Sequence, residues 1–249
     1  MTRMWSCVAV LMLIGMPARP ADARQAGDPP AVRYELADPA SGTAFRVYRA
    51  DPEDALFEIR GGDVTVRRHV TRRVSTTAIT AGREALTLTS SAEGIRLAGP
   101  QGVLIARPGD RAAGEAIRDH LRGSAAMDAA MTVLSRLAGS VSAPVAHVVS
   151  STRHVLGALS GQPVPRPRLT FDRSVRPRAR LASTRIQTTP GECWDIYAEE
   201  AIEIWMEYED CVDTREWYDL IGYTACASVY DLRAIAAFSW YLKCTAIRA

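Results

Sequence analysis

The fold of the last quarter of the chain is decided by two stretches of equal length, CWDIYAEEAIEIWMEYEDC (193–211) and CASVYDLRAIAAFSWYLKC (226–244). Each stretch begins and ends with cysteine, and its two cysteines are 18 residues apart. Eighteen residues make five whole turns of an α-helix, which places both cysteines on one line of the helix, about 27 Å apart. That distance is too long for a bond within the helix, so each partner must come from the other helix.

Antiparallel packing of the two helices predicts which cysteines are bonded. The residue numbers of facing pairs then add to one constant total, and this holds for Cys193 with Cys244 and for Cys211 with Cys226. We therefore predict these two disulfides, one at each end of a helical hairpin.

The same rule predicts further contacts across the hairpin. It sets Tyr197 opposite Trp240, and it brings Glu200 within one turn of Arg233. Residues 213–222 begin with a capping-box pattern and end in glycine, which predicts a short connecting helix between the two long ones.

Charge and aromatic content divide the chain into three parts. The linker, residues 160–190, has seven Arg against one Asp and contains five Pro, a composition typical of an extended spacer. Residues 191–249 have twelve acidic against four basic side chains and hold 11 of the 17 aromatic residues. We expect an acidic, aromatic hairpin at 191–249 that is joined by the linker to a body at 31–159.

The first part of the body shows the alternation of β-strands. Apolar and polar residues alternate in short runs that are separated by turn residues. The expected strands are 31–36, 43–49, 56–60, 63–69, 73–79, 85–89, 94–98 and 103–106. Gly61-Gly62 predicts a two-residue hairpin turn between two of them.

The second part of the body has helical periodicity. Asp110 is a candidate cap for a helix to residue 121, and two further helices are expected over 125–137 and 142–159. Strands followed by helices indicate an α+β fold. We expect an antiparallel β-meander packed by about three helices, followed by the disulfide-stapled hairpin.

The N-terminus resembles a secretory signal. Arg3 precedes ten uncharged residues at 7–16, and an A-x-A cleavage pattern follows at 21–23. Cleavage after residue 23 leaves four cysteines, an even number that is typical of disulfides in an oxidising compartment. We therefore expect a secreted or periplasmic protein with no integral membrane anchor after removal of residues 1–23.

The histidines indicate no metal or nucleophile site. His147, Ser151 and His154 share one helix face, and we expect this face to be solvated because apolar residues lie on the opposite face. His69 lies among arginines in an expected strand, a pattern typical of an exposed or edge strand. No catalytic, cofactor or metal motif is present, so we assign no catalytic residue, cofactor or metal ligand.

Trp194 and Trp205 lie off the cysteine line on a shared helix face. They are our candidates for docking a partner, with packing against the body as the alternative. The leading hypothesis is an exported, non-enzymatic binding or structural protein with an unidentified protein partner and no nucleic-acid partner.

Three alternatives remain open from the sequence. The first is a carrier of an apolar ligand held between sheet and helices. The second is a secreted hydrolase with non-contiguous catalytic residues, for example around His147, Ser151 and His154. The third is a precursor that releases the hairpin by cleavage in the linker.

Overall fold

One antiparallel sheet and five helices make up the structure, a computed structural model that describes residues 31–38, 42–140, 143–162, 190–215 and 219–246. The strands, adjacent in chain order, are β1 (Tyr34–Asp38), β2 (Thr43–Asp51), β3 (Asp54–Gly61), β4 (Val64–Thr71), β5 (Val74–Ala81), β6 (Glu84–Ser91), β7 (Gly94–Gly99) and β8 (Gly102–Ala106). The helices are α1 (Arg111–Arg122), α2 (Ala125–Ser140), α3 (Ala143–Ser160), α4 (Pro190–Asp213) and α5 (Leu220–Ala246). The predicted α+β meander with a C-terminal helical hairpin is confirmed.

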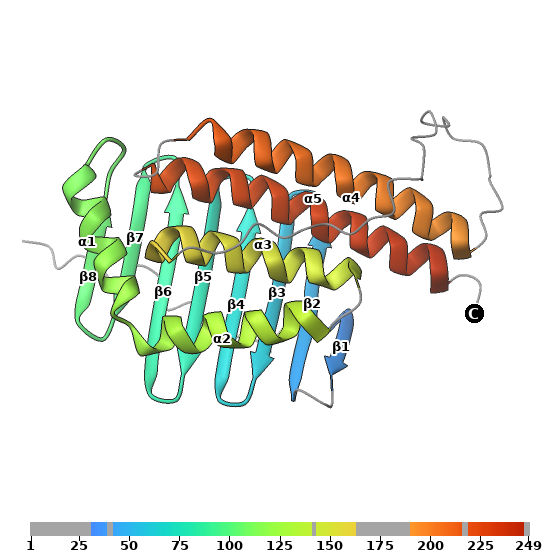
Figure 1. Ribbon diagram of the computed structural model, residues 1–249, viewed down its shortest axis with the longest axis horizontal. Helices are drawn as coiled ribbons and strands as arrows, with labels where there is room; N and C mark the ends of the chain where they lie inside the picture. Colours follow the sequence, from blue (N-terminus) through green and yellow to red (C-terminus); the bar gives the residue numbers. More distant parts are fainter. Residues whose placement is uncertain (1–30, 39–41, 141–142, 163–189, 216–218, 247–249) are drawn as a thin grey trace, which may run out of the picture. The chain divides into compact units, whose positions relative to one another are not determined.

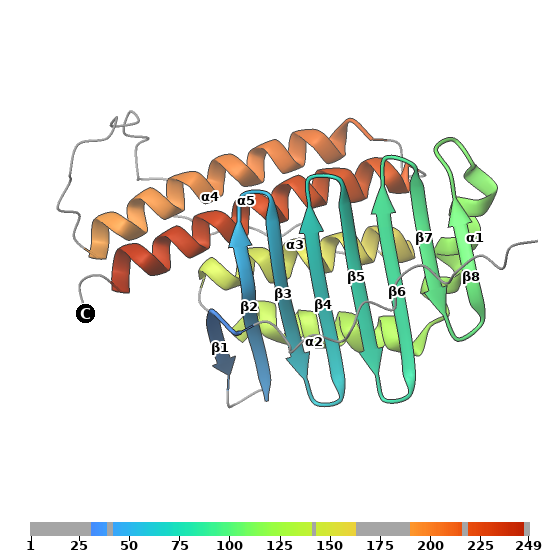
Figure 2. The ribbon, with the colours of Figure 1, turned by 180° about the vertical axis from the view of Figure 1, so that it is seen from behind.

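Alternation along the strands sorts the side chains onto two faces of the sheet. In β4, Val64, Val66 and Val70 are buried, whereas Thr65 and His69 are half-buried on the opposite face. Figures 1 and 2 show the described helices over one face of the sheet, which we call the inner face, and none of them over the outer face. β4 is a central strand, so His69 lies on an exposed face but not on an edge.

The turn between β3 and β4 is shifted by one residue from the prediction. Gly61 is the last residue of β3 and pairs with Val64, so the turn consists of Gly62 and Asp63. Gly62 has a φ of 61°, a backbone conformation that favours glycine. Gly61 is needed for a different reason, because a Cβ atom there would lie 2.8 Å from a methyl group of Val133 in α2.

The helices of the body begin close to the expected positions. Asp110 caps α1, and its carboxylate accepts a hydrogen bond from the backbone N–H of Ala113 at 3.0 Å. The predicted helices over 125–137 and 142–159 correspond to α2 and α3. Residues 1–23 and 163–189, which include the predicted signal and most of the predicted linker, lie outside the described residues.

The predicted connecting helix between the two long helices does not end at Gly222 as expected, and its residues 216–218 lie outside the described residues. α5 begins at Leu220, so Gly222 lies in its first turn and does not end a separate helix. Asp219 explains this start, because its carboxylate accepts the N–H of Gly222 at 2.8 Å, as expected of an N-terminal cap.

Packing joins the hairpin to the body. α2 and α5 lie on the inner face, α3 packs against both of them, α4 packs against α5, and α1 packs against β8 (Figure 1). From Val32 onward the described residues form one compact unit, in which Phe57 of the sheet, Leu134 of α2 and Ile235 of α5 belong to one apolar core. The hairpin therefore shares its core with the body.

Candidate functional site

Both predicted disulfides are present. Cys193 is bonded to Cys244 and Cys211 to Cys226, with Cα–Cα distances of 6.0 and 5.8 Å. The two bonds join α4 to α5 near both ends of the hairpin. They indicate an oxidising compartment outside the cytoplasm.

The predicted contacts between the disulfides are partly confirmed. Arg233 Nη2 lies 3.9 Å from Glu200 Oε1, and the Arg233 guanidinium also contacts Glu207. Tyr197 packs on Tyr241, with ring centroids 5.2 Å apart, whereas the predicted partner Trp240 is 41% exposed. Successive residues of a helix are rotated by about 100° about its axis. Tyr241, one position after the predicted Trp240, therefore faces Tyr197, and Trp240 faces the surface.

A buried polar cluster joins α5 to the sheet and to α3. Arg68 of β4 and Asp231 of α5 form an ion pair in which both side chains are at most 1% exposed. Ser151 Oγ of α3 lies 3.1 Å from the second carboxylate oxygen of Asp231, and Arg68 Nη1 donates to Thr77 Oγ1 at 2.8 Å. Burial raises the pKa of Asp231 above its ordinary value, and Arg68 and Ser151 oppose that shift.

The histidine face of α3 is not solvated as predicted. Ser151 is fully buried, and His154 Nδ1 lies 2.6 Å from the Tyr208 hydroxyl of α4. The prediction failed because α3 packs against α2 and α5 together, so both of its sides are covered. The side chain of His147 lies outside the described residues.

α5 crosses the inner face of the sheet from β6 to β1 at a regular pitch. Successive contacts of the helix advance by seven residues for every two strands. They are Thr224 with Ser90 of β6, Asp231 with Arg68 of β4, and Phe238 with Phe45 of β2, followed by Ser239 with Tyr34 of β1. Seven helical residues rise about 10.5 Å, which matches two strand spacings of about 4.8 Å each. The helix axis therefore runs nearly perpendicular to the strands.

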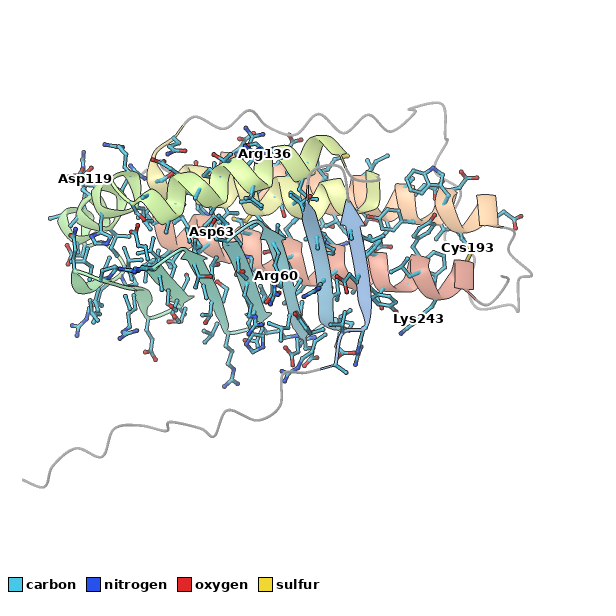
Figure 3. All side chains as sticks on the ribbon, turned by 90° about the horizontal axis from the view of Figure 1, so that it is seen from below. Arg60, Asp63, Asp119, Arg136, Cys193 and Lys243 are labelled. Carbon is cyan, nitrogen blue, oxygen red and sulfur yellow. A yellow bond between two sulfur atoms is a disulfide. The ribbon has the colours of Figure 1, made fainter. Side chains whose placement is uncertain are left out.

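The hairpin continues past the edge of the sheet. β1 is the last strand, but α5 extends to Ala246, and the beginning of α4 accompanies it (Figures 1 and 2). Figure 3 shows the labelled residues Cys193 and Lys243 beyond β1. We call residues 190–197 and 240–246 the overhang.

The overhang is aromatic and partly exposed. Trp194 packs on Tyr197 and Tyr241, with ring centroids 5.9 and 5.8 Å apart. Ile196 and Trp240 are each 41% exposed. The Cys193–Cys244 disulfide lies within the overhang, where no described strand supports the helices from below.

The two predicted docking residues have different surroundings. Trp194 lies in the overhang and is half-buried. Trp205 is 5% exposed and packs on Tyr208 and Tyr230, so it belongs to the core. Sequence reasoning placed Trp240 opposite Tyr197 and missed its exposure, because α5 is apolar on most of its sides and the exposed Val229 and Trp240 are themselves apolar.

A second candidate surface is the outer face of the sheet, where Glu58 lies beneath two arginines. The Glu58 side chain is fully buried and accepts hydrogen bonds from Arg67 at 2.7 and 2.9 Å, from Arg60 (labelled in Figure 3) and from the Tyr48 hydroxyl at 3.2 Å. Burial opposes ionisation of Glu58, but the hydrogen bonds from Arg67 and Arg60 outweigh it and hold its pKa below the ordinary value. The charges of this cluster are thus paired within the sheet.

A third candidate is a cavity of about 290 Å³ at the end of the sheet that carries β8. Its lining includes Ile95, Ala106, Arg107, Arg111, Arg215 and Leu220. Two of these arginines face carboxylates, since Arg111 pairs with Glu115 at 2.9 Å and Arg215 lies 3.7 Å from Asp219. This mixed and largely neutralised lining selects neither an apolar ligand nor an anion.

No protein-family model matches the chain, and neither a curated protein nor a solved structure matches it. Among the described residues, no three or more His, Cys, Asp and Glu side chains are grouped so that they could hold a metal ion. None of the described helices combines the length and the apolar character needed to cross a membrane.

Proposed function

We propose that the protein is an exported, non-enzymatic binding protein that holds a protein partner at the overhang. One observation carries this proposal: α5 is longer than the sheet is wide, so its end presents apolar side chains where the sheet gives no cover. Ile196 and Trp240 are the most exposed of these side chains. Large aromatic residues in such positions are frequent anchors of protein interfaces.

The overhang has the rigidity that a binding surface requires. The rings of Trp194, Tyr197 and Tyr241 pack on one another, and the Cys193–Cys244 disulfide joins the two helices beside them. A surface that is ordered before binding loses less conformational entropy when the partner arrives. The location of this disulfide therefore supports a binding role for the overhang.

The alternative functions have less support. A hydrolase would need an accessible nucleophile, and Ser151 is fully buried and engaged with Asp231. A carrier would need space between sheet and helices, and Phe45, Phe57 and Phe238 fill part of that layer. Export is supported by the signal-like residues 1–23 together with the two disulfides.

Site-specific photo-crosslinking in the exporting cell tests the proposal. A benzophenone amino acid at position 240 should give a discrete adduct with one partner protein. The same group at Met206, which is 59% exposed on α4 away from the overhang, is the matched control and should not give that adduct. Equal adducts at both positions, or none at position 240, would contradict a binding role for the overhang.

A further inference from the structure

We propose that the partner contributes an extended segment that pairs with β1 as an additional strand beneath the overhang; this inference rests on the proposed function. The rise of α5 along its axis shows how far the helix extends past β2. Phe238 lies over β2, and Ala246 is eight residues further along, a rise of about 12 Å. Two strand spacings past β2 amount to about 9.6 Å, so the helix covers β1 and one further strand position.

β1 is an edge strand of the sheet, to which such a strand can be added. β1 pairs with β2 on one side, and no described residue pairs with its other side. Tyr34 and Leu36 of β1 lie on the inner face and are half-buried, and Val32, which precedes the strand, is 44% exposed. An edge strand offers unpaired N–H and C=O groups, which are a template for strand addition.

The overhang would cover the inner side of the added strand. Tyr241 and Leu242 lie three and four residues after Phe238, one turn further along the same side of α5, and both are half-buried. Apolar side chains on alternate residues of the added strand would pack under them and beside Leu36. The opposite edge differs, because α1 packs against β8 there.

A second copy of this chain does not fit the position. Antiparallel β1–β1 pairing of two copies has its two-fold axis perpendicular to the sheet, so both overhangs would lie on the same side. Each would then enter the space above the other copy's β1, which Phe238 and Ser239 of that copy already contact. A peptide segment without a helix of its own avoids this clash.

The charges around β1 and the overhang favour particular residue types on the outer face of the added segment. Described acidic side chains around β1 and the overhang outnumber the basic ones by one: Glu35, Glu192, Asp195, Glu199 and Glu200 against Arg33, Arg46, Arg233 and Lys243. On the outer face, Glu35 of β1 is 42% exposed at the edge strand and forms an ion pair with Arg46 of β2 at 2.7 Å, so a basic side chain of the segment would add to this pair. We assign the partner as an extended segment in which apolar residues alternate with Lys or Arg.

Peptide binding to the full oxidised chain tests the inference. The probe is an eight-residue peptide in which Lys alternates with Val, Leu or Phe, titrated by fluorescence anisotropy. One control peptide has the same composition with its apolar residues contiguous, and the other has a central Pro. We expect the alternating peptide to bind roughly tenfold more tightly than either control, because proline removes a ladder hydrogen bond and broken alternation turns apolar side chains to the outer face.

Two readouts locate the bound peptide. Hydrogen exchange of residues 34–38 should slow on binding, and Leu242→Lys should weaken binding while Ile105→Lys on β8, a residue that is 59% exposed, should not. Thermal melting checks that both variants are folded.

Binding without protection of residues 34–38, or without preference for the alternating peptide, would overturn strand addition. A dimer in sedimentation with a protected β1 would also overturn it. If position 240 still crosslinks a partner in any of these cases, the proposed function stands; without that adduct both fail.

Discussion

At the residue scale, the pair of Arg68 and Asp231 shows how polar groups fix the position of α5. Arg68 lies on the inner face of a central strand, where its buried charge needs an acidic partner. Asp231 is the one acidic residue in the stretch 226–244. Arg68 Nη2 is buried without a hydrogen-bond partner among the described residues. A buried charge that loses its partner is costly, so only one register of α5 on the sheet satisfies both groups.

Removing one member of this pair should cost more than removing both. Asp231→Ala leaves the Arg68 charge buried and should lower the free energy of unfolding by about 3–5 kcal/mol. The double variant Arg68→Met/Asp231→Leu should be closer to wild type, because it leaves no unpaired charge. Urea unfolding with the disulfides intact measures the difference, with Arg96→Met on the exposed outer face as a control. A double variant that is less stable than Asp231→Ala would refute this account.

Glu58 predicts how stability depends on pH. Its pKa is lower in the fold than its ordinary value of 4.5, so it contributes stability above that pH and the contribution is lost as the pH falls. The melting temperatures of wild type and Glu58→Gln should therefore differ most near neutral pH, and the difference should shrink as the pH falls below 4.5 and through the lowered pKa of Glu58. Glu93→Gln, at an exposed turn, is the matched control. A difference that stays constant from pH 7 to pH 3 would show that Glu58 is not held ionised.

At the element scale, the strands, the helices and the disulfide pairing could be predicted, because each depends on a period within the chain. Alternation identified all eight strands, and the spacing of the cysteines identified the facing helices. Contacts that depend on tertiary packing could not be predicted. The overhang depends on how α5 crosses the sheet, and the burial of Ser151 depends on α2 and α5 covering α3 together. The burial of Arg68 could have been predicted, because the alternation along β4 places it on the same face of the sheet as Val66 and Val70.

The two disulfides should have separable effects. In the chain-entropy model, loops closed by separations of 51 and 15 residues contribute about 4 and 3 kcal/mol. Loss of Cys193–Cys244 by Cys→Ser replacement should also speed hydrogen exchange at 190–197 and 240–246, because none of the described strands supports the helices there. Cys226 lies in the part of α5 that crosses the sheet. Loss of Cys211–Cys226 should therefore leave hydrogen exchange at 190–197 and 240–246 unchanged. The same exchange pattern in both variants would contradict this assignment.

At the scale of the whole molecule, the sheet and the hairpin form one core. Ile235 and Phe238 of α5 are buried against the body, so the hairpin alone would expose an apolar face. A fragment of residues 190–249 with both disulfides formed should keep helical circular dichroism but bind a hydrophobic dye and melt without cooperativity. Cooperative melting of this fragment would show that the hairpin is an independent module.

The most direct test of the central claim is the hydrogen-exchange profile along α5 in the free, oxidised chain. We predict slow exchange over 226–238, where the helix lies on the sheet, and faster exchange over 240–246 together with 34–38, where no described strand pairs with the outer side of β1. Uniformly slow exchange from 226 to 246 would contradict it, because the helix would then be covered along its whole length and no site for an added strand would remain.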